Sequence, residues 1–289
     1  MLPDNLPPSP SAATLPLAQG DLSPSDTAEL QALKRLMQET LGLHFEGYKE
    51  KCLRRRIAVR MRAHAVHTYA DYGAVLERDV DEHHRLLDSI TINVSKFFRN
   101  NDTWSTLREV VVPALFARPD RRINIWSAGV AGGEEAYTLA IVLREHAERH
   151  GGDLSRFRIL GTDIDRQSLE SAARGEYGAF SFTETDDATR ARWFEWAGTW
   201  RVREEVRAMV EFGRLDLMKD PFPAGQHLVL CRNVIIYFER VVQEVLFGRF
   251  RDALVPDGYL VLGKVESLFG PASRAFLAVA GRERVFRRL

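Results

Sequence analysis

Cysteine is scarce in this chain of 289 residues, which contains only Cys52 and Cys231. Two cysteines so far apart form neither a disulfide framework nor the clustered ligands of a structural zinc site. An excess of one charge sign is missing as well, because 40 Lys and Arg residues balance 40 Asp and Glu residues. No overall field therefore attracts nucleic acid or anionic lipid, and electrostatic recognition must be local.

Long hydrophobic runs are also absent. Stretches such as residues 110–112 stop after a few residues, far below the roughly 20 that cross a bilayer. The first 20 residues contain no Lys or Arg, so they lack the basic start of a secretory signal. We expect a cytoplasmic protein with no direct membrane insertion and no nucleic acid partner. Residues 1–26, rich in Pro, Ser, Ala and Leu, are expected to form a disordered tail.

Helical spacing dominates the next segment and predicts an all-helical domain over residues 27–92. Within it, residues 48–64 carry seven cations against the single anion Glu50. Leu53, Ile57 and Met61 recur four apart, which indicates an amphipathic helix with a strongly basic face. Such a face is either simply solvated or a docking surface for an acidic partner, and the residues alone favour neither.

Strands alternate with helices from residue 122 onward, which predicts an α/β fold with a parallel sheet. Strands are expected near residues 123–126, 158–161, 228–231 and 259–263, and helices over 134–146 and 241–254. Residues 256–258, Pro-Asp-Gly, are expected to end the second helix. Trp193, Trp196 and Trp200 have helical spacing and are expected to pack in the core.

Polar residues follow several of these strands, where parallel sheets usually bind ligands. A glycine-rich loop at 127–133 leads into Glu134 and Glu135. A pyrophosphate site would not carry two carboxylates, whereas a ligand ammonium would be favoured by them; simple complementation of the helix dipole is an equal alternative. Asp163 ends the next strand, where a carboxylate can accept ribose hydroxyls, and Asp165 suits a helix N-cap.

Two further segments complete the set. Residues 231–237, Cys-Arg-Asn-Val-Ile-Ile-Tyr, end a strand in polar groups and lack the proline-rich aromatic motif of amide methylases. Residues 93–100 place Phe97 and Phe98 between polar side chains, as either a buried anchor beside a site or an interdomain hinge.

Together, residues 91–99, 125–137, 162–165, 231–238 and 254–263 resemble the CheR family of chemotaxis protein-glutamate O-methyltransferases. The resemblance implies a class I, Rossmann-like domain that uses S-adenosylmethionine and spans residues 93–289. It also implies a small β-subdomain inserted at about residues 177–213, and the helical N-terminal domain in front. The expected partner is the cytoplasmic domain of methyl-accepting chemotaxis receptors, and the enzyme is expected to be a monomer.

The resemblance also implies roles for particular residues. Arg99 and Tyr237 match the pair near the transferred methyl, and Arg56, Arg60 and Arg62 match the receptor-facing helix. Contacts with S-adenosylmethionine are expected at Asn93, Ser95, Arg99, Glu135, Asp163, Asp216, Leu217, Arg232 and Asn233. A glutamate acceptor, with a reference pKa of about 4.3, is already ionised at neutral pH, so no catalytic histidine is required.

Two alternatives stay open. Residues 130–133 lack the hydroxyls usual in the family, and residues 264–265 also depart from its pattern. A degenerate docking module that binds a signalling partner without catalysis is therefore the first alternative. An NAD-dependent oxidoreductase is the second, disfavoured by the paired glutamates and the lack of a complete G-x-G-x-x-G motif.

Overall fold

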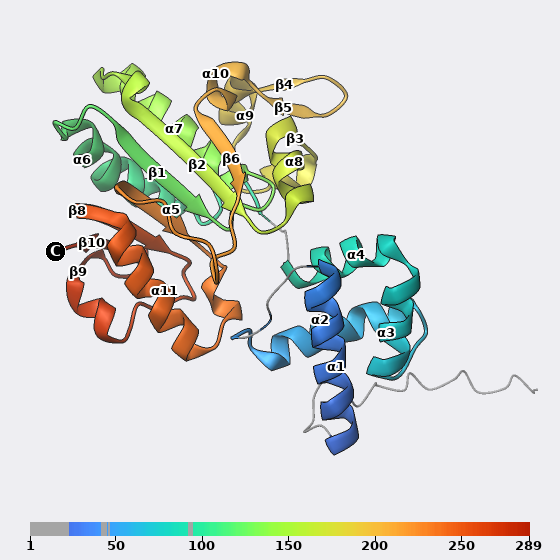
Figure 1. Cartoon of the computed structure of the whole chain (residues 1–289). Coiled ribbons are helices and arrows are strands. Elements are labelled where there is room, and N and C mark those ends of the chain that lie inside the picture. Colours follow the sequence, from blue (N-terminus) through green and yellow to red (C-terminus); the bar gives the residue numbers. More distant parts are fainter. Residues whose placement is uncertain (1–22, 42–44, 46, 92–94) are drawn as a thin grey trace, which may run out of the picture. The chain divides into compact units, whose positions relative to one another are not determined.

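The computed structural model describes residues 23–41, 45, 47–91 and 95–289 (Figure 1). The chain divides into two compact units between Thr91 and Ile92. Within the described part of the chain, no helix combines the length and the apolar character needed to span a membrane.

The first unit is all-helical, with α1 (Pro24–Leu41), α2 (Glu50–Ala63), α3 (Tyr69–Arg78) and α4 (Val80–Thr91). Helix α1 begins at Pro24, three residues before the expected start of the helical domain, and the rest of the expected tail, residues 1–22, lies outside the described residues. The reason is local: Ser23 Oγ accepts a hydrogen bond from the Asp26 amide at 3.1 Å and donates to its carboxylate at 2.7 Å. Proline at the first helical position completes this N-terminus.

Helix α2 confirms the amphipathic pattern read from the sequence. Leu53, Ile57 and Met61 are buried against the other helices. The opposite stripe, Lys51, Arg55, Val59 and Arg62, is exposed. Three of these four solvent-facing side chains are cationic, so α2 presents a basic surface of its own unit.

The second unit contains a seven-stranded sheet in the order β6-β2-β1-β7-β8-β10-β9 (Figure 1). Strand β10 is antiparallel to both β8 and β9, whereas the five strands from β6 to β8 are parallel. This confirms the α/β class. The strands are β1 (Ile123–Ala128), β2 (Phe157–Asp163), β6 (Val210–Arg214), β7 (Gln226–Cys231), β8 (Leu254–Leu262), β9 (Phe276–Ala280) and β10 (Val285–Arg288).

Helices connect these strands, and most of them contribute buried side chains to one apolar core with the sheet. The helical stretch before the sheet consists of α5 (Asn101–Thr106), a π-helical turn (Leu107–Val111) and α6 (Val112–Ala117). The crossover helices are α7 (Glu134–His150), α8 (Arg166–Arg174) and α11 (Arg240–Ala253), and short 3-10 turns occur at Leu154–Arg156, Ala179–Phe182, Ile235–Tyr237 and Pro271–Ala275.

A small three-stranded antiparallel sheet, in the order β3-β5-β4, lies within this unit. It is shorter than the expected insert at 177–213, because residues 210–213 belong to β6 of the large sheet. Trp196 and Trp200 oppose each other across its hairpin, and Trp196 is 64% exposed, so the core packing expected of Trp196 is wrong, whereas Trp193 is buried as expected. The elements are β3 (Glu176–Tyr177), α9 (Asp187–Trp193), β4 (Phe194–Trp196), β5 (Trp200–Val202) and α10 (Glu204–Arg207).

Strand β8 corrects another expectation. Pro256 and Asp257 lie inside this strand and do not end α11, which stops at Ala253. The register with β7 shifts here, from Gln226 opposite Leu254 to Leu228 opposite Tyr259. The irregularity accommodates a proline and a residue with φ of +58° within a strand.

Candidate active site

The carboxyl ends of β2, β1 and β7 meet at one edge of the sheet. These strands are neighbours, with Ala128 opposite Thr162 and Ser127 opposite Leu230. The segments that follow them carry most of the predicted site residues. This edge is where open parallel sheets bind their ligands.

The glycine-rich loop after β1 is held tightly by its neighbours. The amides of Gly129 and Val130 both donate to the Thr162 carbonyl, at 2.8 and 2.9 Å. Gly129 has φ of +74°, and a Cβ there would lie 2.3 Å from Val234 Cγ2. Position 129 therefore requires glycine for two reasons. Its backbone is left-handed, and the loop after β7 packs directly on it and leaves no room for a side chain.

Asp163 lies at the centre of this edge and is buried. Its Oδ2 accepts the Ala131 amide at 2.9 Å and its Oδ1 accepts the Asp165 amide at 3.0 Å. Among the described residues, none of the ion pairs includes this carboxylate. Burial raises the pKa of Asp163, and the amide donors oppose that rise. Asp165 accepts hydrogen bonds from the amides of Gln167 and Ser168, the capping role expected of it.

Glu135, Arg232 and Arg99 form one connected group. Arg232 Nη1 lies 3.1 Å from Glu135 Oε2, and Ser127 Oγ donates to Glu135 Oε1 at 2.8 Å. Arg232 Nη2 donates to the Arg99 carbonyl at 2.8 Å. Three segments distant in sequence are thus joined at the same edge.

The segment around Arg99 is anchored to the second unit by the two residues before it. Phe97 is fully buried, with its ring 5.1 Å from that of Phe182, and its amide donates to Ser181 O at 2.9 Å. The Phe98 amide donates to Thr138 Oγ1 at 3.2 Å. Ser95 and Arg99, on either side of these anchors, are half-buried, and Asn93 lies outside the described residues.

Glu134 was considered with Glu135 as a partner for a ligand ammonium, but it was not among the expected cofactor contacts. It is buried, and its Oε1 accepts a hydrogen bond from Ser181 Oγ at 3.1 Å. Its Oε2 receives no hydrogen bond from any residue the structure describes. Burial raises the pKa of Glu134. Its position beside Glu135, at the start of the same helix, was the available signal.

The loop after β7 places Asn233 and Tyr237 at the same edge. Asn233 has φ of +62°, and its buried Oδ1 has no donor within the described part of the chain. Tyr237 is half-buried at the end of the 3-10 turn Ile235–Tyr237. The backbone of this loop is held by the buried carboxylate of Glu266 through the amides of Asn233, Val234 and Ile236.

Asp216 and Leu217 follow β6 and reach the site through β2. The Leu215 amide donates to the Asp163 carbonyl at 3.0 Å, which brings the buried Asp216 close to that strand end. Asp216 Oδ1 accepts the Met218 amide at 2.8 Å, and the Leu217 carbonyl accepts a hydrogen bond from Arg249. Both predicted positions are therefore ordered by local hydrogen bonds.

The three predicted receptor-facing arginines of α2 have different surroundings. Arg62 is exposed and Arg56 is half-buried. Arg60 instead donates through Nε and Nη2 to the fully buried Glu82, at 2.9 and 2.6 Å. Arg60 is thus engaged inside the helical unit, and the exposed cations beside Arg62 are Lys51 and Arg55.

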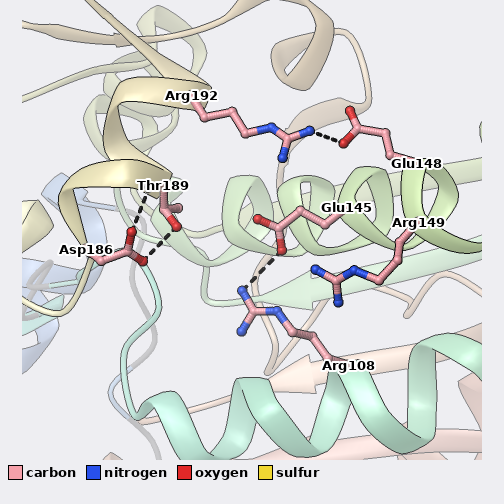
Figure 2. Close-up of a pocket in the computed structure, with 7 residues that line it drawn as sticks. All are labelled: Arg108, Glu145, Glu148, Arg149, Asp186, Thr189 and Arg192. Carbon is pink, nitrogen blue, oxygen red and sulfur yellow. Dashed lines mark hydrogen bonds and ion pairs between the residues drawn. The ribbon is translucent and has the colours of Figure 1, made fainter.

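A separate cavity of about 500 Å³ lies far from this edge (Figure 2). It is lined by Glu145, Glu148 and Arg149 of the last turns of α7, roughly 16 to 22 Å along the helix from Glu134. Glu145 pairs with Arg108 at 3.3 Å, and Glu148 pairs with Arg192 of α9. These ion pairs connect α9 and the π-helical turn to α7, so the residues around this cavity stabilise the packing of the helices.

The residues at the carboxyl edge suit S-adenosylmethionine. This cofactor presents ribose hydroxyls, an ammonium and a sulfonium, and the edge offers Asp163 and Glu134, two buried carboxylates outside the described ion pairs. The open acceptor Oδ1 of Asn233 adds a third partner for a donor. A parallel sheet with one reversed strand and an acidic residue ending β2 defines the class: a class I methyltransferase dependent on S-adenosylmethionine.

Comparison with known families identifies the group within this class. Residues 93–284 match the model of the CheR methyltransferase SAM-binding domain, and residues 28–91 match that of the CheR methyltransferase all-alpha domain. The chain belongs to the CheR methyltransferase family, and S-adenosylmethionine is its cofactor.

Curated relatives extend over most of the chain. The chemotaxis protein methyltransferase of Listeria innocua is 33% identical over 240 residues, covering 82% of this chain and 89% of the relative. The protein of the same name in Borreliella burgdorferi is 28% identical over 262 residues, covering 87% and 92%. The family resemblance read from the motifs is therefore confirmed.

Proposed function

We propose that this enzyme transfers a methyl group from S-adenosylmethionine to glutamate side chains in the cytoplasmic domain of chemotaxis receptors, forming glutamyl methyl esters. The observation that carries the proposal is the group at the carboxyl edge, where Glu135, Arg232 and Arg99 are linked beside Asp163. The relatives named chemotaxis protein methyltransferase support the receptor as acceptor.

The chemistry agrees with the residues present. S-adenosylmethionine supplies an activated methyl on a sulfonium. A glutamate carboxylate is ionised at neutral pH and attacks without a general base, and none of the residues described above at this edge is a histidine. The protein's task is to align the acceptor and to exclude water, because a hydrated carboxylate is a weak nucleophile.

Each residue then has a specific task. We assign Asp163 to the ribose hydroxyls, because it ends β2, each of its oxygens accepts one amide and keeps a further lone pair, and its charge has no cationic partner among the described residues. Arg99 and Tyr237 orient the reacting groups. Ser95, Glu135, Asp216, Leu217, Arg232 and Asn233, together with Asn93, form the remaining cofactor contacts.

The receptor surface is assigned to the exposed stripe of α2. Its cations Lys51, Arg55 and Arg62 suit an acidic partner, and electrostatic complementarity mainly accelerates encounter. Arg56 stands at the border of this stripe. Arg60 contributes from within, because its pairing with Glu82 fixes α2 to α4.

The experiment is incubation of the purified chain with methyl-labelled S-adenosylmethionine and a receptor cytoplasmic fragment. Incorporated label that is released as methanol by mild base would establish methyl esters. A fragment with its acceptor glutamates changed to alanine should incorporate none. Cofactor binding without any transfer would favour the non-catalytic docking module instead.

A further inference from the structure

Glu266 lies outside the set of residues assigned to the site, yet its surroundings are unusual. Its side chain is buried and accepts four backbone amides. Oε2 accepts from Gly263 at 2.6 Å and Asn233 at 3.0 Å, and Oε1 accepts from Val234 at 3.0 Å and Ile236 at 3.3 Å. One carboxylate thus holds the loop after β7 and the loop after β8 together.

The loop that Glu266 holds carries two assigned site residues. Asn233 has φ of +62°, a left-handed conformation that a non-glycine residue keeps only when its surroundings hold it. Val234 packs on Gly129 of the glycine-rich loop. The amide of Ile236 fixes the 3-10 turn that ends at Tyr237. A shift of Glu266 would therefore move the positions of Asn233 and Tyr237.

A carboxylate is the side chain that this arrangement requires. Four converging N–H donors need an acceptor with two oxygens and no hydrogen of its own. Glutamine has nearly the same shape, but its NH2 group would face two of the four donors. Unmatched buried donors are costly, so the loop would move to avoid that contact.

We propose that Glu266 is a positioning residue for methyl transfer: its carboxylate sets the backbone of residues 233–237, so that Asn233 and Tyr237 meet the cofactor and the acceptor. The inference rests on the function proposed above. Glu266 itself touches neither substrate, since all four of its described contacts are with the protein backbone.

The test is Glu266→Gln compared with Glu145→Gln. Glu145 is a matched control in the same unit, because its carboxylate accepts from Arg108 and Trp193 but lies at the other end of α7 (Figure 2). Calorimetry with S-adenosylhomocysteine should show at least about tenfold weaker binding for E266Q. The kcat for receptor methylation should fall as well, with the KM for the receptor fragment unchanged. E145Q should lose thermal stability and keep wild-type binding.

The variant Gly263→Ala disturbs the contact between Glu266 and the loop after β7 without changing Glu266 itself. A Cβ at Gly263 would lie 2.8 Å from both the Asn233 nitrogen and Glu266 Oε2, and the backbone there accepts alanine because its φ is not positive. G263A, like E266Q, should weaken S-adenosylhomocysteine binding. If E266Q does not fold, the binding measured for G263A tests the positioning role of Glu266.

The outcomes separate the two proposals. Wild-type binding and wild-type kcat in both E266Q and G263A would overturn the positioning role. Absence of methyl transfer in the wild-type enzyme would instead contradict the proposed function. In that case the positioning role would still be judged by S-adenosylhomocysteine binding alone.

Discussion

Buried carboxylates have different partners in the two units. In the helical unit, Glu82 accepts hydrogen bonds from Arg60, from His64 at 2.8 Å and from Tyr72 at 2.6 Å. Burial opposes ionisation, but these donors lower the pKa of Glu82 to about 2. In the methyltransferase unit, Asp163 and Glu266 accept backbone amides, and burial raises the pKa of each.

The difference separates structure from function. Glu82 has its charge balanced by a guanidinium, so nothing is left for a ligand and the group serves to join α2, α3 and α4. Amides satisfy hydrogen bonds but carry no net charge. Asp163 and Glu266 therefore keep a negative potential at the carboxyl edge, which suits a cofactor carrying a sulfonium and an ammonium.

The largest effect is expected from Glu82→Leu, which leaves the half-buried Arg60 without its anion and removes the acceptor shared by Tyr72 and His64. Removing one partner of a buried pair costs about 3–5 kcal/mol of unfolding free energy. Urea denaturation followed by circular dichroism measures the loss. Arg60→Met combined with Glu82→Leu should recover part of it, because no uncompensated charge remains. Equal stability of the single and double variants would contradict the account of this pair.

Asp163→Ala should weaken S-adenosylhomocysteine binding at least about tenfold, or about 1.4 kcal/mol. The reason is loss of the acceptor assigned to the ribose hydroxyls. Calorimetric titration measures the change. Asp165→Ala is the matched control: it should cost about 1 kcal/mol of stability through the lost N-cap while leaving affinity within about twofold. Unchanged affinity in D163A would remove Asp163 from the site.

Charge reversal on the exposed stripe of α2 should have a smaller effect. Arg55→Glu with Arg62→Glu should reduce receptor methylation several-fold, mainly through slower encounter, and leave cofactor affinity intact. The remaining rate should also depend less on salt than the wild-type rate. Steady-state kinetics at two ionic strengths provide the measurement. An unaltered rate and salt dependence would exclude this stripe as the docking surface.

The last effect is a pH dependence of stability that is seen only under acid conditions. The pKa of Glu82 is lowered from about 4.5 when unfolded to about 2 when folded, so its ionised form stabilises the helical unit. That stabilisation is complete above about pH 4.5 and is lost as the pH falls towards 2. Thermal unfolding across this range should show a weaker dependence for Glu82→Gln. If the wild-type protein and Glu82→Gln lose stability equally as the pH falls, other titrating groups cause the acid dependence.

The sequence predicted those helices and strands whose residues show a clear apolar periodicity. Strands β1 and β2, helix α7 and the buried stripe of α2 follow from apolar periodicity and glycine placement. The spacing of Trp196 and Trp200 fits a helix and a tight hairpin equally. The irregularity of β8 at Pro256 is a feature of its pairing with β7, so the local sequence does not predict it.

Long-range contacts explain what was missed. Arg60 looked like one of several surface cations, because its partner Glu82 lies 22 residues away on another helix. Glu266 follows residues 264–265, which depart from the family pattern, but it was not chosen as a site residue, because its role arises only where two strand ends meet. The candidate site residues were chosen through family resemblance, and the geometry adds Glu134 and Glu266 to them.

The most direct test of the central claim is calorimetric titration of the purified chain with S-adenosylhomocysteine, with NADH as the comparison ligand. If Asp163 and the polar groups around it at the carboxyl edge form the cofactor site, S-adenosylhomocysteine should bind with a dissociation constant of micromolar order and NADH should not bind. Binding of NADH, or of neither ligand, would contradict the account.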